Sequence, residues 1–526
     1  MSPAWLLLLA CADKLPPPPG ATDTAPTDTV DTAPTDTTDT AVTDTSMDSG
    51  ATTDDYDVTL GEPVSCEAPL ADVAYADVAE AMGLASLAGG EGAAAVADFD
   101  GDGDLDIALA YGDAIAQPLQ IYYRDGDSFV ARGVDGEEAS GLGLADLDGD
   151  GDLDLAVGGE APWIARNDGD GFSPAVSIPS ADEQLHRELV PADFDGDGDV
   201  DLAVVLTGDD GPLNYLLRNR GGFDFEASSP FPAAHAGREG FDGLVLDWDG
   251  DRRPDLYVVN DRGASLGPNA LYRNTGDGTF EDASEACACG LTMSGMGGSA
   301  GDYDGDGVQD IYLAATDRNV LLRGLGDGTY ADVTATAGAD PIEAAGDMAW
   351  GTALLDFDND GDLDIAVAQG DFYSDEDEDP DGALGFNLLR QDDGAFTDVA
   401  GDYGLAGDAY WRAIVPADHN GDGVLDLLVT DAAAGPRLYL SQGCTAAAWL
   451  AVEAPLDSEV RVTAGGRTRT RWVRTDQGFA GARAPEVWFG LGGATTVDRL
   501  EVILPWTGAS VVVEEPFEAR RRVRVQ

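Results

Sequence analysis

The chain has 526 residues, of which 100 are acidic and 28 are basic, and its formal net charge is −72. This balance excludes nucleic acid as a partner, because such binding needs a basic surface. It suits a salty exterior, where ions screen the repulsion among carboxylates, and the length allows more than one domain.

Residues 1–11 form a short apolar segment that ends at Cys11 and is too short to span a bilayer. It resembles a bacterial lipoprotein signal, in which Leu8-Leu9-Ala10-Cys11 matches the lipobox and Cys11 receives the lipid. The segment lacks the Lys or Arg that a secretory signal carries before its apolar run, so either the true start lies upstream or the signal is atypical. A frayed apolar terminus is the alternative. We expect an exported protein of a bacterial cell envelope, held at the outer membrane or cell surface by its lipid alone.

Residues 12–65 are dominated by Thr, Asp and Pro, with the repetitive stretch TDTAPTDTVDTAPTDTTDTAVTDT. No apolar period runs through them, so they cannot bury a core. We predict a disordered tether that holds a globular part away from the membrane.

Seven short aspartate loops follow, which we number one to seven from their first residues Asp98, Asp146, Asp193, Asp247, Asp302, Asp356 and Asp418. Each loop places oxygen side chains at its positions 1, 3, 5 and 9, and six of the seven have Gly at position 6. These are the hard oxygen ligands that Ca²⁺ prefers, and position 7 can add a backbone carbonyl. Acidic turns without metal are the alternative, but they have no reason to keep this spacing seven times.

The predicted ligands of up to seven Ca²⁺ ions are Asp98, Asp100, Asp102, Asp104 and Asp106; Asp146, Asp148, Asp150, Asp152 and Asp154; Asp193, Asp195, Asp197, Asp199 and Asp201; Asp247, Asp249, Asp251 and Asp255; Asp302, Asp304, Asp306, Val308 and Asp310; Asp356, Asp358, Asp360, Asp362 and Asp364; and Asp418, Asn420, Asp422, Val424 and Asp426. An EF-hand would need Glu at position 12 and flanking helices, whereas position 12 is Leu or Val here. Short apolar runs after each loop predict buried strands instead.

A second pattern recurs between the loops, as in LYRNTGDGTF at residues 271–280 and LLRGLGDGTY at residues 321–330. Gly-Asp-Gly between apolar runs indicates a tight hairpin, so each repeat holds about four strands. Four-stranded units repeated roughly every 50 residues predict an all-β fold with a seven-bladed β-propeller over residues 66–444. The last unit lacks a final strand, and residues 75–84 offer a spare copy that would complete it.

These units resemble the FG-GAP/VCBS repeats of integrin α-like propellers, and residues 293–307 (MSGMGGSAGDYDGDG) are similar to the cartilage acidic protein and UnbV group. The resemblance implies that the loops bind calcium on one face of the disc. Residues 445–526 form a second, small β domain, in which WFGLG at residues 488–492 is similar to the ASPIC/UnbV module. Its eleven arginines favour a solvated face, with docking on the acidic propeller as the alternative.

Four cysteines remain besides Cys11. Cys66 precedes the spare strand and Cys444 ends the last repeat, so closure of the ring would bring them together as a disulfide; two free thiols are the alternative. Cys287 and Cys289 form either a local bridge or free thiols.

Catalysis finds little support, since the histidines His186, His235 and His419 stand apart and no GxSxG or HExxH motif is present. We expect a monomeric protein without enzymatic activity that serves extracellular binding or adhesion, with an unidentified protein or glycan as ligand. An extracellular enzyme acting on polysaccharide and a purely structural envelope component are the alternatives. Convergent acid and base groups at the propeller axis would favour the enzyme.

A ligand is expected on the face opposite the aspartate loops, because loops on a rigid scaffold carry function. The loops concerned are residues 111–119, 158–163, 207–213, 260–270, 316–319, 369–386 and 430–436. Phe372 and Tyr373 favour partner contact for the acidic loop after them, with a disordered acidic tip as the alternative.

Loop four is predicted to bind calcium most weakly or not at all, and loop seven next most weakly. In loop four, Arg252 replaces the Gly at position 6 and Arg253 follows it, which adds two positive charges beside a cation site. The arginines could pair with the carboxylates in place of the metal. In loop seven, Asn420 lowers the negative charge but keeps an oxygen ligand.

Overall fold

The computed structural model describes residues 56–84, 92–111, 118–169, 171–180, 185–208, 214–232, 235, 238–276, 278–371 and 383–526. All belong to one compact unit, Ala51–Gln526. The predicted signal peptide (residues 1–11), its lipidation site Cys11 and tether residues 12–55 lie outside the described residues. The helices that are described, α1 (Ala79–Met82), α2 (Gly263–Leu266) and α3 (Thr334–Ala337), are too short to cross a membrane.

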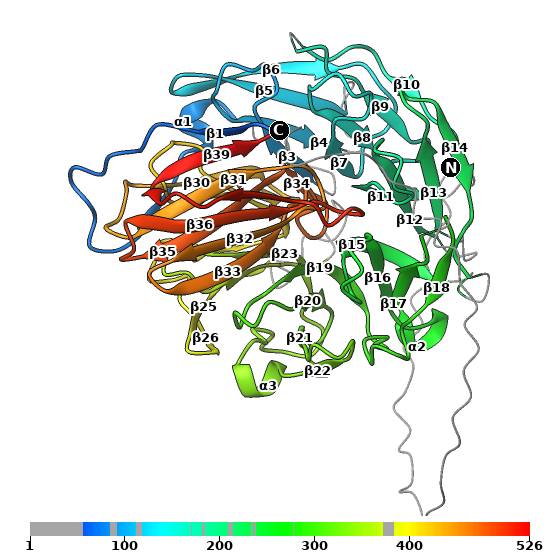
Figure 1. Ribbon diagram of the computed structural model, residues 1–526. Helices are drawn as coiled ribbons and strands as arrows, with labels where there is room; N and C mark the ends of the chain where they lie inside the picture. Colours follow the sequence, from blue (N-terminus) through cyan, green and yellow to red (C-terminus); the bar gives the residue numbers. More distant parts are fainter. Residues whose placement is uncertain are drawn as a thin grey trace, which may run out of the picture. The chain divides into compact units, whose positions relative to one another are not determined.

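Seven sheets, each built on four antiparallel strands, follow one another in the described part of residues 75–441, and two of them carry a fifth strand (Figure 1). The first three hold β3 (Ala93–Ala97), β4 (Asp106–Ala110), β5 (Leu119–Asp125) and β6 (Ser128–Val134); β7 (Leu142–Ala145), β8 (Asp154–Val157), β9 (Trp163–Ala165) and β10 (Val176–Ser177); and β11 (Leu185–Ala192), β12 (Asp201–Thr207), β13 (Tyr215–Asn219) and β14 (Phe225–Ser228). The next two hold β15 (Glu239–Leu246), β16 (Asp255–Asp261), β17 (Ala270–Asn274) and β18 (Phe280–Asp282); and β19 (Gly295–Gly301), β20 (Asp310–Ala315), β21 (Val320–Gly324) and β22 (Tyr330–Asp332).

The last two hold β23 (Ala349–Leu355), β24 (Asp364–Gln369), β25 (Leu384–Asp392) and β26 (Ala395–Asp398), with β27 (Asp408–Ala409) beside β25; and β28 (Trp411–Ala417), β29 (Asp426–Asp431), β30 (Gly435–Ser441) and β2 (Tyr75–Asp77). The first strand of each sheet contacts the first strand of the next, and β28 contacts β3. The predicted β-propeller is confirmed.

The inner strands are buried on both faces because each sheet packs against its two neighbours. In β12, residues 201–206 are all buried, so the sequence shows a continuous apolar run rather than an alternating one. The N-terminal strand β2 pairs with β30, with Tyr75 opposite Ser441 and Asp77 opposite Tyr439, which is where the sequence placed residues 75–84.

Both predicted cysteine partners lie beside this seam, and Cys66 and Cys444 form a disulfide with their Cα atoms 5.9 Å apart. This prediction is confirmed. Cys287 and Cys289 also form a disulfide, which decides between the two alternatives left open for them.

Residues 445–526 form a small β module, as predicted, in which two sheets share one apolar core. One sheet holds β31 (Ala448–Glu453), β35 (Glu486–Gly492), β39 (Arg521–Val525) and β1 (Val58–Leu60). The other holds β32 (Glu459–Ala464), β33 (Arg467–Trp472), β36 (Thr496–Ile503), β37 (Ser510–Val513) and β38 (Phe517–Glu518).

The tether prediction is wrong at its C-terminal end, because residues 58–60 form β1. This strand pairs antiparallel with β39, with Val58 opposite Val525. Tyr56 and Val58 pack against the core of the module. This packing and the pairing with the edge of β39 order a segment whose composition alone had predicted disorder.

The module also sends a segment, residues 475–483, into the ring of first strands, and we call this segment the plug. Its strand β34 (Gly481–Arg483) pairs in parallel with β3 as a fifth strand of the first sheet (Figure 1). The side chain of Phe479 is fully buried, with its ring 5.0 Å from Trp350 on β23 and 6.5 Å from Phe241 on β15. The plug therefore fills the region bounded by the first strands.

Replacing Phe479 by Ala is expected to lower the free energy of unfolding by about 3–5 kcal/mol, because the substitution leaves a cavity among aromatic side chains. Urea unfolding followed by tryptophan fluorescence measures the loss. Phe517→Ala, at a half-buried site on the margin of the module, serves as the control and should cost much less. Equal losses for the two variants would show that the plug is not specifically packed.

Two buried carboxyl groups lie close to the plug. Gly243 N–H donates to Glu188 at 3.3 Å, and Gly298 N–H donates to Asp242 at 2.7 Å. Burial raises the pKa of Glu188 well above its usual value, and the neighbouring charges of Asp242 and Asp476 add to the effect. Burial also raises the pKa of Asp242, to about 6. The folded protein therefore keeps a proton on Glu188 at pH values where the unfolded chain has begun to release it.

The stability of the calcium-saturated protein is accordingly expected to fall as the pH rises toward and through the raised pKa of Glu188. The contribution of this group is fully present below the unfolded pKa, declines by at most about 1.4 kcal/mol per pH unit above it, and is lost once the pH passes the folded pKa. Glu188→Gln removes this proton and should flatten the slope in urea unfolding, whereas the exposed control Glu226→Gln should keep it. An unchanged slope in Glu188→Gln would contradict the assignment.

Candidate metal centre

The structure gathers the aspartate side chains of the loops as the spacing predicted. Carboxylate oxygens within 4.8 Å of one another come from positions 1, 3 and 9 in loops one and two and from positions 1, 3 and 5 in loops three to five. The members of these clusters are Asp98, Asp100 and Asp106; Asp146, Asp148 and Asp154; Asp193, Asp195 and Asp197; Asp247, Asp249 and Asp251; and Asp302, Asp304 and Asp306. These clusters could hold a metal ion.

In six of the seven loops, all but loop six, the backbone turns so that the N–H of position 6 donates to the carboxylate of position 1. Gly103 donates to Asp98 at 3.0 Å, and Gly423 donates to Asp418 at 3.2 Å. Positions 4 and 6 of loop one, Gly101 and Gly103, have φ angles of 71° and 95°, a conformation that glycine adopts at little cost. The loop is therefore shaped before any ion arrives.

The second oxygen of position 1 supports a cation at this point. The Oδ1 atoms of Asp98, Asp247 and Asp356 are buried and have no hydrogen-bond partner. A buried carboxylate oxygen without a partner is costly, and a bound Ca²⁺ would supply the missing interaction. The donor set of these loops thus fits the predicted ion.

Position 9 has a second role that the spacing did not reveal. In all seven loops its carboxylate accepts the N–H of position 2 and a second backbone N–H. This second donor lies in the third strand of the sheet, or just after that strand in loop two. Asp106, for example, accepts from Phe99 at 2.9 Å and from Arg124 at 2.7 Å. Burial raises the pKa of Asp106 to about 7 and that of Asp310 to about 8. Position 9 therefore anchors the loop to its sheet, whether or not it also binds the ion.

Amide side chains join four of the seven loops to the next sheet. Asn167 on the second sheet donates through Nδ2 to the carbonyl of Phe99 in loop one at 2.8 Å, and Asn219, Asn274 and Gln391 repeat the bond to loops two, three and five. Arg124 on the first sheet donates to the carbonyl of His419 in loop seven. These hydrogen bonds hold the loop backbone of one sheet against the neighbouring sheet.

Arginines on the third strands lie beside the candidate ligands, a feature that sequence reasoning missed. Arg166 approaches Asp148 at 3.2 Å, and Arg323 approaches Asp306 at 3.1 Å. The signal was present in the recurring LYRN and LLRG patterns, whose arginine immediately precedes the residue that bonds to position 9. A cation bound in these loops would share the aspartate carboxylates with a guanidinium group.

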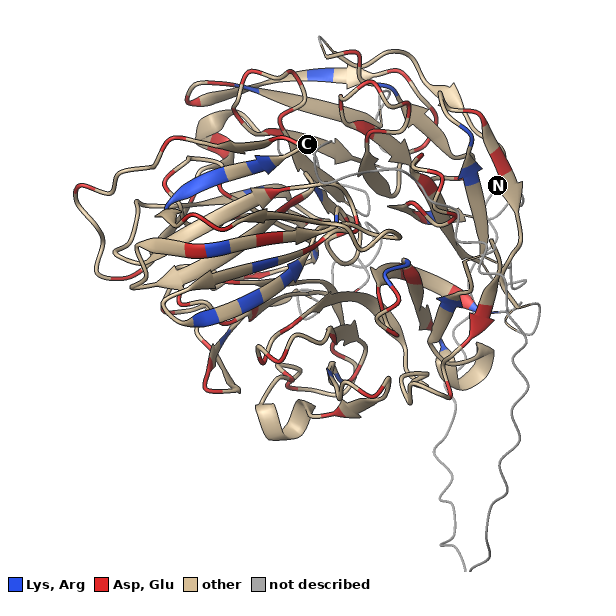
Figure 2. Ribbon diagram, in the orientation of Figure 1, with Lys and Arg blue, Asp and Glu red and all other residues tan. Residues whose placement is uncertain are grey.

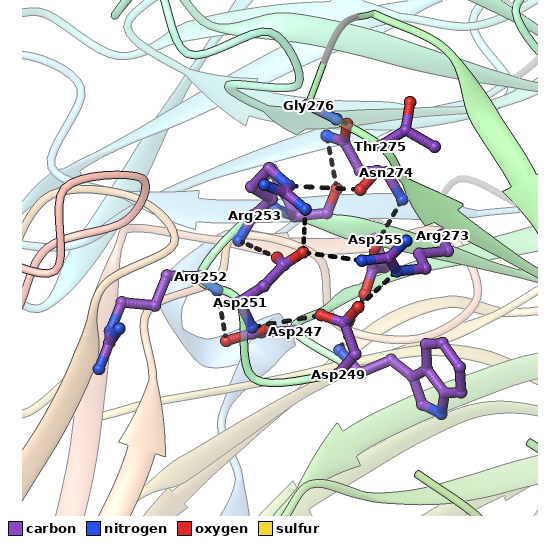
Figure 3. Close-up of polar contacts among 12 residues, drawn as sticks. Asp247, Asp249, Asp251, Arg252, Arg253, Asp255, Arg273, Asn274, Thr275 and Gly276 are labelled. Carbon is purple, nitrogen blue, oxygen red and sulfur yellow. Dashed lines mark hydrogen bonds and ion pairs between the residues drawn. The ribbon is translucent and has the colours of Figure 1, made fainter. Parts of the chain in front are cut away.

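Loop four differs from the others because two arginines reach its carboxylates (Figure 3). Arg253 pairs with Asp251, and Arg273 pairs with Asp249 and, at 3.4 Å, with Asp251. Arg252 takes the glycine-like φ of 67° and keeps the bond from its N–H to Asp247 at 3.1 Å, but its guanidinium points away from the loop (Figure 3). Arg253 thus pairs with the loop as we considered, whereas Arg252 does not.

We expect Asp249→Ala to cost less bound calcium than Asp100→Ala, because the two guanidinium groups already compensate the carboxylates of loop four. Isothermal titration calorimetry of both variants against the unmodified protein gives the number of ions bound. Asp100→Ala should lose one ion and Asp249→Ala none. A loss of one ion from each variant would contradict the predicted weakness of loop four.

In loop seven, Asn420 keeps its amide oxygen toward the loop, where it accepts the N–H of Asp422 at 3.0 Å. Its Nδ2 donates outward to the carbonyl of Ser441 at 3.0 Å. The geometry agrees with an oxygen ligand at this position, and the predicted calcium affinity stays a prediction.

Four of the eleven arginines of the module lie against the propeller, so the solvated face favoured by the sequence is wrong for these four. Arg469, Arg471, Arg474 and Arg483 are buried or nearly so. Arg471 donates to the carbonyl of Asp302 at 3.4 Å, and Arg474 donates to that of Val245 at 3.1 Å. Figure 2 shows arginines along β33 of the module and acidic residues across the propeller. The negative charge of the aspartate loops explains this docking.

Of the loops predicted to bind a ligand, residues 112–117, 209–213 and 372–382, with Phe372 and Tyr373, lie outside the described residues. The loop 260–270 is ordered by its own polar contacts. Asn260 N–H donates to Asn269 at 2.9 Å, and Gly263 N–H donates to Met293 O at 2.9 Å.

Comparison with known proteins agrees with this architecture. The model of the FG-GAP-like repeat matches residues 98–157, 146–204, 193–258, 247–313 and 302–367, and the ASPIC and UnbV model matches residues 453–526. Cartilage acidic protein 1 of Xenopus tropicalis is 30% identical over 129 residues, which is 23% of this chain and 20% of that protein. The Homo sapiens protein is also 30% identical, with 19% of its length covered. The match thus spans about a fifth of the length of these relatives.

Among solved structures, an Agrocybe aegerita lectin that recognises non-reducing terminal N-acetylglucosamine is 19% identical, with a TM-score of 0.39 over 60% of this chain and 80% of the lectin. A Bacillus licheniformis rhamnogalacturonan lyase is 13% identical, with a TM-score of 0.40 over 72% of this chain and 75% of the lyase. Similarities at this level carry no argument about function. The repeat matches together extend over residues 98–367, more than half of the chain, and the protein therefore belongs to the FG-GAP-like repeat family, with an ASPIC and UnbV module after its repeats.

Proposed function

We propose that this protein is an exported, calcium-binding β-propeller that binds an extracellular protein or glycan on the face opposite its aspartate loops. The observation that carries the proposal is the position of the module. It contacts loops three to seven, and its plug fills the region between the first strands. The loop ends on the other face are left for a ligand.

The same observation favours binding over catalysis. Phe479 packs between β15 and β23, where an enzyme would need converging acid and base groups and an open path for substrate. His235, which lies between Tyr272 at 2.9 Å and Asp282 at 2.8 Å, is buried in the fourth sheet. These contacts are those of a satisfied structural histidine.

Export and anchoring belong to the same proposal. Two disulfides suit an oxidising compartment outside the cytoplasm, and Cys11 would carry the lipid that holds the protein at the cell surface. Metabolic labelling with palmitate should mark the wild-type protein and not the Cys11→Ser variant. Equal labelling of the two would remove the lipid anchor from the proposal.

Glycan and protein arrays, run in millimolar calcium and again in excess EGTA, test the binding function. We expect at least one ligand that is retained in calcium and lost in EGTA. Hydrogen exchange with that ligand bound should then show protection in residues 158–163, 260–270, 316–319 or 430–436. Protection confined to the module would contradict the proposed face, and turnover of an arrayed polysaccharide would favour the enzyme.

A further inference from the structure

Loop six departs from the other aspartate loops at position 4, where it carries Asn359 instead of glycine. Asn359 has a φ of 60°, in the left-handed region, and none of its surface is exposed. Asn tolerates this conformation better than most residues do, but glycine adopts it without strain. A buried side chain at this position is therefore a feature that the loop itself does not need.

The contacts of Asn359 join three parts of the protein. Its Nδ2 donates to the carbonyl of Gly423, which is position 6 of loop seven, at 2.7 Å. Its Oδ1 accepts the indole N–H of Trp488 on β35 at 2.7 Å. Its carbonyl accepts the N–H of Gly492 at the end of β35 at 2.8 Å. One residue thus ties loop six to loop seven and to the module.

Two tryptophans of the module rest on these loops. Trp488 stacks on Trp449 with ring centroids 4.6 Å apart and an angle of 12° between the planes, and their exposed fractions are 5% and 2%. The indole of Trp449 packs directly on Gly423, where any side chain would collide with it. The tryptophan pair is therefore held between loop six and loop seven.

The first ligand positions of both loops also contact the module. Gly490 N–H on β35 donates to Oδ2 of Asp356 at 2.9 Å, and Arg522 on β39 lies 3.5 Å from Asp418. Both carboxylates are buried, with 1% of Asp356 and 3% of Asp418 exposed. In loops one and two the first ligands, Asp98 and Asp146, are only half-buried.

We propose that Asn359 couples calcium in loops six and seven to the docking of the module, so that the contact through Trp449 and Trp488 opens when these two loops lose calcium. This inference rests on the proposed calcium binding. An ion fixes the carboxylates of loop six and with them the backbone that presents Asn359 and its carbonyl. Without it, the clustered charges repel one another, and the hydrogen bonds to Trp488 and Gly492 lose their fixed partner. Because linkage is reciprocal, docking of the module in turn raises the calcium affinity of both loops.

Hydrogen exchange in the peptide that covers β35, residues 486–492, reports this contact. Asn359→Gly gives loop six the glycine of the other loops, so calcium binding is retained while the side-chain bonds to Gly423 and Trp488 are lost. In millimolar calcium we expect its exchange in residues 486–492 to be at least tenfold faster than in the unmodified protein. Asn359→Asp keeps an acceptor for Trp488 but loses the donor to Gly423, and should give an intermediate rate.

Matched variants in loop two serve as controls, because no contact in the described part of the chain joins that loop to the module through position 4. Gly149→Asn places the same side chain at an exposed position with nothing within 4 Å of its Cβ and should leave the exchange unchanged. Asp148→Ala and Asp358→Ala should each remove one ion in calorimetry, but only Asp358→Ala should accelerate exchange in residues 486–492.

Two results would overturn the coupling: wild-type exchange rates in Asn359→Gly, or equal acceleration by Asp148→Ala and Asp358→Ala. Calorimetry on the unmodified protein separates this failure from that of the proposed function. If calcium binds and exchange does not respond, only the coupling fails; if no calcium binds, the proposed function fails as well.

Discussion

Withdrawal of calcium with excess EGTA is expected to destabilise the folded protein by several kcal/mol. Extracellular calcium sites have dissociation constants of about 10⁻⁴–10⁻³ M, so millimolar calcium stabilises each occupied loop by about 1 kcal/mol. The effects add over separate loops. The physical origin is visible at position 1, where the Oδ1 atoms of Asp98 and Asp356 are buried without a partner.

Differential scanning calorimetry in calcium, in EGTA and in EGTA followed by magnesium measures the effect. The melting temperature should fall in EGTA and recover with calcium but not with magnesium, which demands a smaller, octahedral site. The carboxylates of position 9 keep their backbone hydrogen bonds without the ion, so the strands should melt cooperatively in both states. A melting curve that EGTA leaves unchanged would refute calcium as a stabilising ligand.

Removal of the bond between Cys66 and Cys444 is expected to cost up to about 6 kcal/mol in the chain-entropy model, because the bond closes 378 residues. The Cys66→Ala/Cys444→Ala variant should unfold at a lower urea concentration than the unmodified protein. Cys287→Ala/Cys289→Ala is the control, since that bond closes only 2 residues and the same model gives about 1 kcal/mol for it. Non-reducing peptide mapping that recovers Cys66 and Cys444 as free thiols would contradict the pairing.

The repeated features could be predicted from the sequence, because the residues that form them recur at a regular local spacing. The seven aspartate loops, the four strands of each unit and the pairing of residues 75–77 with the last sheet all follow from a pattern that recurs along the chain. The Cys66–Cys444 bond followed in turn from the position of the spare strand. The same spacing identified the carboxylate at position 9. It did not predict that this carboxylate accepts two backbone N–H groups, because spacing along the chain does not reveal hydrogen-bond partners.

The contacts between the module and the propeller could not be predicted, because each occurs once and joins distant segments. The plug has no apolar period, and no pattern in residues 475–483 indicates that β34 pairs with β3. The strand β1 is only three residues long and lies in a segment of tether-like composition. Asn359 is a single residue within an acidic loop, and only its contacts with Gly423 and Trp488 give it a role.

The pairing of β1 with β39, of β2 with β30 and of β34 with β3 also bears on the order of events during synthesis. The first strands of the folded unit have their partners among strands that the ribosome makes several hundred residues later. Contacts of such long range form late, because the intervening chain must first be brought together. Under the proposed export, a chain that leaves the cell with its N-terminus first would reach the exterior before these pairs form, and its final closure would take place where calcium and an oxidising environment are available.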